Sequence, residues 1–330
     1  MLGLGINHQK LKFFIFSLTF LVSTLLFAAD NSEVHKTERL MYFVLLQLIV
    51  IILAGRLGGL LAKRTGQNAA VGEIIMGILL GPSLLGLLLP GFFHYVFRSA
   101  PPEPLAILSQ IGLLLLMFQI GLEFNFSHLQ AVHYRKSVLW VSMASLLCPF
   151  ATGFVVGYYG ATQLSPGVNA LHSGLFVATA FSITALPILG RILMDLGMTN
   201  HPIGVIAISS AAINDVVGWV LLAVVTALTT AKFSAASFAF TLVLIATFFI
   251  ASWYVVRPLA HQALNLIEKK SGTEFSDLSL GFLLSLIFLA GLCTYLLGIF
   301  AIFGGFMMGV ILHDREPLVR AWRERMGQFV

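Results

Sequence analysis

The sequence predicts an all-α polytopic membrane protein. Of its 330 residues, 58% are hydrophobic and 10% are charged, and the mean hydropathy is +0.95. Apolar runs of about 20 residues, the length that a helix needs to cross the hydrocarbon core of a bilayer, recur along nearly the whole chain. A soluble α/β protein would have shorter apolar runs and more charges, and an outer-membrane barrel would alternate apolar and polar residues. We therefore expect a multi-pass helical protein, with a bacterial-type inner membrane as its location.

The apolar runs divide into nine expected spanning segments joined by short connections. Their approximate bounds are 40–62, 68–90, 104–124, 137–159, 169–192, 203–229, 235–256, 278–297 and 299–313. If residues 30–39 lie outside, twelve basic residues fall inside: Lys63, Arg64, Arg135, Lys136, Arg191, Arg257, Lys269, Lys270, Arg315, Arg320, Arg323 and Arg325. Only Lys36, Arg39, Arg98 and Lys232 fall outside. This excess follows the positive-inside rule and supports both the segments and the orientation. It also explains the net charge of +5 without a nucleic-acid partner.

The first 29 residues have the pattern of a secretory signal. Lys10 and Lys12 precede an apolar run from Phe13 to Phe27, and small residues follow it. A basic start and an apolar run of about 15 residues are typical of a signal peptide. The cleavage pattern is poor, so residues 1–29 are expected to be either a signal peptide or a retained signal anchor.

Three segments are not expected to be plain helices. Segment 68–90 is rich in glycine and contains Pro82, and segment 299–313 contains three glycines, for which close helix packing is the simpler explanation. Segment 169–192 carries Ser182 and Thr184 shortly before Pro187. Because proline has no N–H to donate, the helix there is expected either to kink or to unwind, with bare carbonyl groups facing a cation.

Asp215 is the principal candidate for a functional site. It lies about twelve residues into its segment, which places it about 18 Å along the helix and near the middle of a core about 30 Å thick. A carboxylate at that depth costs about 2.5 kcal/mol or more on insertion scales, so an ion or proton site is the default interpretation. The alternative is a buried ion pair, for which Arg56 is the one basic residue well inside a segment.

The chemistry of a buried carboxyl group suits exchange of a proton for a cation. Burial favours the protonated form of such a group, whereas a bound cation favours the ionised form. If both compete for the same oxygens and the site faces each side in turn, the result is antiport. Asn214 adds an uncharged oxygen and two N–H donors, either as a cation ligand or as a tie to segment 169–192.

Other polar residues give weaker signals. Glu73 and Glu123 lie near the expected cytoplasmic ends of their segments, either in a cation funnel or simply at solvated helix ends. Cys148 and Cys293 lie in apolar segments and are expected to be core residues. The nine histidines show no zinc-ligand spacing, and no nucleophile triad, P-loop or dinucleotide motif is found. We therefore expect no enzyme activity, no cofactor and no metal other than a transported ion.

Five stretches, taken in order, resemble the monovalent cation:proton antiporters, in the branch of the Kef-type potassium exporters and the plant cation/proton exchangers. They are VGEIIMGILLGPSLLG (71–86), LLLLMFQIGLEF (113–124), AFSITALPILGRIL (180–193), SSAAINDVVGW (209–219) and GIFAIFGGFMMGVIL (298–312). The resemblance covers the chain from about residue 40 to its end. The Ile-Asn-Asp sequence is more similar to the exchanger branch than to the Kef-type systems, which have Gln-Asp.

The resemblance implies two inverted repeats with broken helices crossing in the membrane, a homodimer, and a core domain that moves like an elevator. It implies that Asp215 carries the proton or the cation, and that Ser182, Thr184 and their neighbours line the crossing. A single acid in the pair further suggests electroneutral one-for-one exchange. Sequence does not choose between Na⁺ and K⁺.

In the family, further spanning helices follow the segment that matches 299–313. The resemblance therefore implies that residues 40–330 form an exchanger domain truncated at its C-terminus, as a fragment or a shortened product. Two alternatives to antiport stay open: a channel-like potassium efflux protein on the same scaffold, and a membrane remnant or sensor that does not transport.

Overall fold

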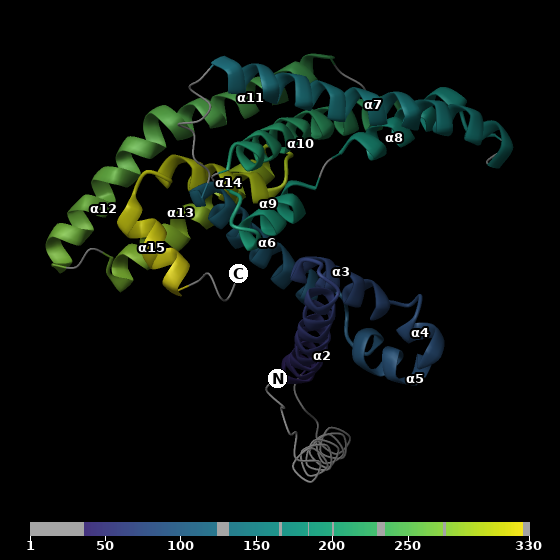
Figure 1. Cartoon of the computed structure of the whole chain (residues 1–330), viewed down its shortest axis with the longest axis horizontal. Helices are drawn as coiled ribbons and strands as arrows, with labels where there is room; N and C mark the ends of the chain where they lie inside the picture. Colours follow the sequence, from purple (N-terminus) through teal and green to yellow (C-terminus); the bar gives the residue numbers. More distant parts are fainter. Residues whose placement is uncertain are drawn as a thin grey trace, which may run out of the picture. The chain divides into compact units, whose positions relative to one another are not determined.

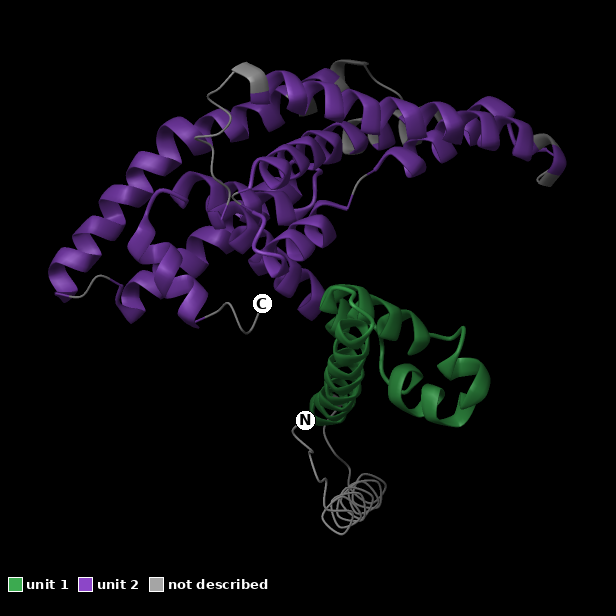
Figure 2. Ribbon diagram, viewed as in Figure 1, with its two compact units in different colours: residues 1–106 green, residues 107–330 purple. Residues whose placement is uncertain are grey.

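The computed structural model describes residues 36–123, 132–164, 167–183, 185–199, 201–229, 235–272 and 275–325. Those residues form helices joined by short turns, with no strand among them. They belong to two compact units, residues 1–106 and 107–330 (Figure 2). The expected signal segment, 1–29, lies outside the described residues.

Unit 1 is built on the long helix α2 (Lys36–Arg64) and the short helix α3 (Ala69–Leu79). The two helices pack closely where Gly58 faces Gly72, since a side chain at either glycine would meet the backbone of the other. Asn68 caps α3 by accepting a hydrogen bond from the backbone N–H of Ala70 at 2.7 Å.

The remainder of segment 68–90 does not continue α3, so this segment is not one plain helix. The chain turns at residues 80–84 and forms α4 (Leu85–Leu88), α5 (Pro90–Phe93) and the π-helix η1 (His94–Arg98). Pro82 explains the end of α3, because it lacks an N–H and disfavours helical backbone at the residue before it. Gln47 of α2 ties η1 to the unit by donating to the carbonyl of Val96 at 2.9 Å.

Unit 2 contains most of α6 (Glu103–Glu123) and the helices that follow it (Figure 1). The long helix α7 (Val132–Leu164) packs along α8 (Ala170–Ser182) and against α10 (Pro202–Thr229). The short helix α9 (Leu186–Asp195) also contacts α10. Within segment 169–192, α8 therefore ends at Ser182 and α9 begins at Leu186, shortly before Pro187.

The helix expected to end at residue 256 runs on to residue 271. It consists of α11 (Ala235–Ala251), the π-helix η3 (Ser252–Val256) and α12 (Arg257–Ser271). The wider π turn ends two residues before Pro258, which cannot donate to the carbonyl of Tyr254 four residues earlier. Gly272 ends α12 in the left-handed conformation, with φ of 69°, which glycine adopts at little cost.

The last three helices are α13 (Asp277–Leu296), α14 (Ala301–Leu312) and α15 (Glu316–Arg325). The glycines of α14 serve close packing, as the simpler interpretation held. A side chain at Gly305 would meet the carbonyl of Leu114, and one at Gly309 would meet that of Phe118, both on α6. Six described helical stretches are long and apolar enough to cross a membrane, and three shorter apolar helices accompany them. The protein is thus an all-α, multi-pass membrane protein.

Two clusters of buried apolar side chains hold unit 2 together. One joins α6, α12, α13, α14 and α15 around Phe118 and Trp322. The other joins α6, α9, α10 and α14, with Ile120, Leu186 and Ile208 fully buried. The second cluster matters most for the site, because it fixes the start of α9 against α10.

Charged side chains connect α12 to the turn between α14 and α15. Arg257 donates to Asp314 at 2.6 Å, and Nε2 of His261 lies 3.3 Å from the same carboxylate. Partial burial opposes ionisation of Asp314, but the hydrogen bond and charge of Arg257, helped by His261, outweigh it and lower the pKa of Asp314. A second pair, Arg315 and Glu268, lies 2.7 Å apart and mostly buried.

Candidate functional site

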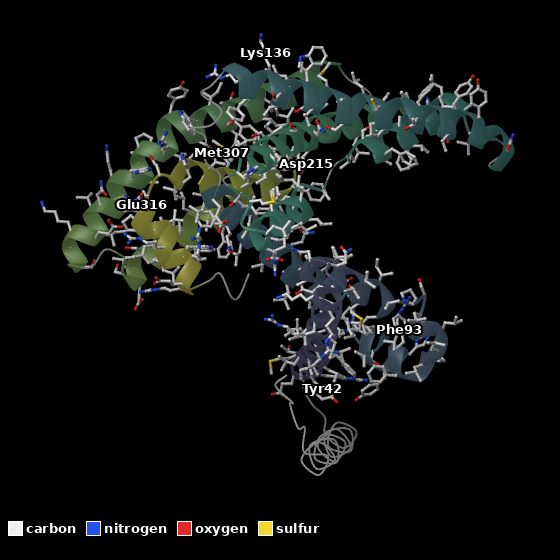
Figure 3. The ribbon with its side chains drawn as sticks, viewed as in Figure 1. Tyr42, Phe93, Lys136, Asp215, Met307 and Glu316 are labelled. Atoms are coloured by element: carbon white, nitrogen blue, oxygen red, sulfur yellow. The ribbon has the colours of Figure 1, made fainter. Side chains whose placement is uncertain are left out.

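The candidate site lies on α10, where Asn214 and Asp215 are both buried. Their exposed fractions are 2% and 4%, and Figure 3 marks Asp215 on this helix. Within unit 2, no salt bridge to Asp215 is found among the described residues. A carboxyl group buried in this way depends on hydrogen bonds, a proton or a cation for its stabilisation.

The break between α8 and α9 brings a backbone donor toward this acid. The backbone N–H of Leu186, the first residue of α9, lies close to the Asp215 carboxylate. The first N–H groups of a helix have no partner within the helix, and they carry the positive end of its dipole. The interruption before Pro187 therefore directs a backbone donor at the acid, rather than only bending the helix.

Close packing brings α10 up to this break. Gly218, one turn after Asp215, is buried, and a side chain there would come within 2.9 Å of Cγ1 of Ile183. Ile183 is the residue at which α8 gives way to extended backbone. A glycine at 218 thus lets α10 lie directly against the unwound stretch.

Ser182, the last residue of α8, is buried and bound to backbone. Its hydroxyl group faces the carbonyl oxygens of Ala178 at 2.7 Å and of Leu146 on α7 at 3.2 Å. The hydroxyl group of Ser182 thus fastens the end of α8 to α7. Because its hydrogen is donated to these carbonyl groups, its oxygen could coordinate an ion only through a lone pair. Thr184, the other residue expected here, lies outside the described residues.

Asn214 is held by α7 as well. Its Nδ2 donates to Oγ of Ser145 at 2.7 Å, while its buried Oδ1 has no hydrogen-bond partner among the described residues. One turn earlier, Ser210 donates to the carbonyl of Val138 on α7 at 3.2 Å. The structure therefore fastens Asn214 and Ser182 to two adjacent residues of α7, Ser145 and Leu146.

The two glutamates expected in a funnel have different surroundings. Glu73 lies on α3 in unit 1, beside Gly55 and Gly59 of α2. Glu123 ends α6 in unit 2 and is largely buried. The hydroxyl of Thr199 donates to it at 3.4 Å, and Arg323 of α15 lies 3.4 Å from it. Glu123 is thus a paired carboxylate, and a cation would have to compete with Arg323 for it.

Sequence reasoning missed Ser145 and the N–H of Leu186. Ser145 precedes Pro149 by four residues, so its own carbonyl group lacks the N–H that would normally bond to it within α7. Among the described residues, no group of three or more His, Cys, Asp or Glu side chains could hold a resident metal ion.

The fold and the site together define a multi-pass membrane protein with a polar centre at an interrupted helix. The sequence profile described as sodium/hydrogen exchanger, transmembrane, matches residues 41–329. The chain belongs to this family, which is a family of membrane transporters.

Individual relatives agree with this assignment. The Na(+)/H(+) antiporter NhaS4 of Synechocystis sp. is 35% identical over 292 residues, which cover 87% of this chain and 69% of the relative. Cation/H(+) antiporter 19 of Arabidopsis thaliana is 32% identical over 87% of this chain and 35% of its own length. K(+)/H(+) antiporter 1 of Saccharomyces cerevisiae is 25% identical over 86% of this chain and 33% of its own. The chain thus spans about a third of the plant and yeast relatives.

Proposed function

We propose that this protein exchanges a monovalent cation, Na⁺ or K⁺, for protons across the membrane, and that Asp215 binds the two in alternation. The observation that carries the proposal is the buried carboxyl group of Asp215, close to the first N–H of α9 and adjacent in sequence to Oδ1 of Asn214, which has no hydrogen-bond partner among the described residues. The proposed role is that of a transporter and not of an enzyme.

The residues present suit this chemistry. A carboxylate and an amide carbonyl are oxygen ligands, the type that unwound segments of transporters offer to alkali cations. When no cation is bound, a proton neutralises the buried carboxyl group at a smaller cost than leaving it charged. One group that cannot hold both ligands at once couples their movements in opposite directions.

The transport cycle is proposed from the family resemblance. We propose a homodimer in which the part of the molecule bearing α10 and the α8–α9 break moves relative to the rest, so that the site faces each side in turn. One proton replaces one monovalent cation, so the exchange is electroneutral. Because relatives are named as Na⁺/H⁺ and K⁺/H⁺ antiporters, both cations remain candidate substrates.

Transport by the full-length protein in proteoliposomes tests the proposal. A pH-sensitive dye inside the vesicles is expected to report proton movement when Na⁺ or K⁺ is added outside, and Asp215→Asn is expected to abolish it. Asp277→Asn is the matched control, because Asp277 is fully exposed and its ion pair among the described residues is a surface pair with Arg325. Antiport that survives in Asp215→Asn would refute the assignment.

The same vesicles separate the alternatives. A channel-like potassium efflux protein would give K⁺ flux driven by a membrane potential, without proton counter-transport. A non-transporting protein would give no flux with any cation, and Asp215→Asn would change nothing. Net charge movement during cation-driven proton transport would refute one-for-one exchange.

A further inference from the structure

The hydroxyl group of Ser145 has its hydrogen committed to its own helix. Oγ lies 2.7 Å from the carbonyl oxygen of Val141, one turn earlier on α7. A hydroxyl has a single hydrogen to donate and two lone pairs that accept. What Ser145 presents to α10 is therefore an acceptor.

This acceptor decides which end of the Asn214 amide faces it. Nδ2 of Asn214 lies 2.7 Å from Oγ of Ser145, so the amide donates and the hydroxyl accepts. Turning the amide over would place two acceptor oxygens against each other and lose the bond. Oδ1 is consequently held away from α7, buried and without a partner among the described residues.

We propose that Ser145 is a positioning residue for the cation site: it fixes the amide of Asn214 so that Oδ1 stays free for the cation that Asp215 binds. This inference rests on the proposed function. It gives a reason for a buried carbonyl oxygen without a hydrogen-bond partner, which proteins seldom leave in place. It also extends the site to α7, a helix in which sequence analysis predicted no ligand.

The first test is Ser145→Ala in the full-length protein, assayed by cation-driven proton movement at fixed pH. Without the acceptor the amide can turn, and the half-saturating Na⁺ or K⁺ concentration is expected to rise about 5- to 10-fold, with the maximal rate changed less than about twofold. Ser145→Thr keeps a hydroxyl that can bond to the same carbonyl and is expected to restore the wild-type value. An unchanged half-saturating concentration in Ser145→Ala overturns the proposal.

Ser285→Ala is the matched control. Like Ser145, Ser285 is exposed, and its hydroxyl group donates to the carbonyl four residues earlier, that of Gly281, at 2.9 Å. Ser285 lies on α13, however, and not on α7. Its substitution is expected to leave transport unchanged. Ser145→Cys, with a weaker acceptor of nearly the same size, is expected to give an intermediate shift and provides the test if Ser145→Ala assembles poorly.

A double-mutant cycle distinguishes positioning from a general packing effect. In the Asn214→Ala background there is no amide to orient, so adding Ser145→Ala is expected to leave the half-saturating concentration where Asn214→Ala put it. Two shifts that multiply would show that Ser145 acts independently, and the proposal would be wrong.

The failures of the two proposals are distinguishable. Activity that persists in Asp215→Asn refutes the proposed function itself. An inactive Asp215→Asn together with a wild-type half-saturating concentration in Ser145→Ala refutes only the positioning role.

Discussion

Trp322 is expected to be the side chain that holds α15 against the other helices of unit 2. Its exposed fraction is 1%, and its ring lies edge-on to that of Phe118 with centroids 4.7 Å apart. The rest of α15 is mainly polar, with Leu318 as its other buried residue. Truncating a buried tryptophan to alanine costs about 3–5 kcal/mol, so Trp322→Ala is expected to lower the thermal midpoint by on the order of 10 °C.

Trp322→Phe makes the test sharper. The indole Nε1 of Trp322 has no hydrogen-bond partner among the described residues, and a buried unpaired donor costs about 1–3 kcal/mol. Phenylalanine removes that donor and loses roughly 40 Å² of apolar contact, worth about 1 kcal/mol. The two effects nearly cancel, so the free energy of unfolding of Trp322→Phe is expected to stay within about 1 kcal/mol of the wild-type value.

The assay is thermal unfolding in detergent, followed by size-exclusion chromatography of the heated samples. The thermal midpoint of Trp322→Ala is expected to fall well below that of wild type. The midpoint of Trp322→Phe is expected to stay close to the wild-type value. A Trp322→Ala protein within about 2 °C of wild type would refute the anchoring role. A Trp322→Phe protein as damaged as Trp322→Ala would refute the argument about the unpaired donor.

Two further predictions concern packing and pH. Gly309→Ala is expected to destabilise the folded protein by about 1–3 kcal/mol, because its methyl group would overlap the backbone of α6. A methyl group at Gly281 on α13 would meet nothing within 4 Å, so Gly281→Ala is expected to be neutral or stabilising. Thermal midpoints measured in detergent compare the two variants. The pKa of Asp314 is lowered in the folded protein, so its ionised form adds stability that is present above the unfolded pKa of about 4 and is lost as the pH falls further. Asp314→Asn is therefore expected to melt below wild type at pH 7, with a difference that shrinks below about pH 4; a constant difference across that range would contradict the prediction.

Some features of the fold follow directly from residue type. Pro187 predicts a weakened turn in segment 169–192, because a proline inside a helix removes a donor whatever surrounds it. The glycines of α14 predict close contact, because they leave room for another backbone. In both cases the physical cause lies within the segment itself.

Other features depend on contacts that the sequence does not specify. Pro82 and Pro258 are both prolines in apolar surroundings, yet α3 ends before Pro82 while the helix continues past Pro258 through a π turn. Which outcome occurs depends on whether neighbouring helices support the weakened turn.

At the candidate site, too, some features follow from residue type and others depend on contacts between helices. The burial of Asp215 could be predicted, because the residue lies within a long apolar run. Its proximity to the N–H of Leu186 and the contact between Asn214 and Ser145 could not be predicted, because they require the register between α9, α10 and α7. A serine within an apolar helix usually donates to a backbone carbonyl of the same helix, as Ser145 does to that of Val141. The contact of Ser145 with Asn214 therefore cannot be recognised from the sequence.

The most direct test of the central claim is the proton released when the cation binds. Na⁺ or K⁺ is added to the full-length protein in detergent at low buffering capacity, and a pH-sensitive dye reports the protons set free. If Asp215 alternates between the two ligands, cation binding is expected to release up to one proton per site, and Asp215→Asn is expected to release none. Release that persists in Asp215→Asn, or cation binding to the wild-type protein without proton release at any pH, would contradict the account.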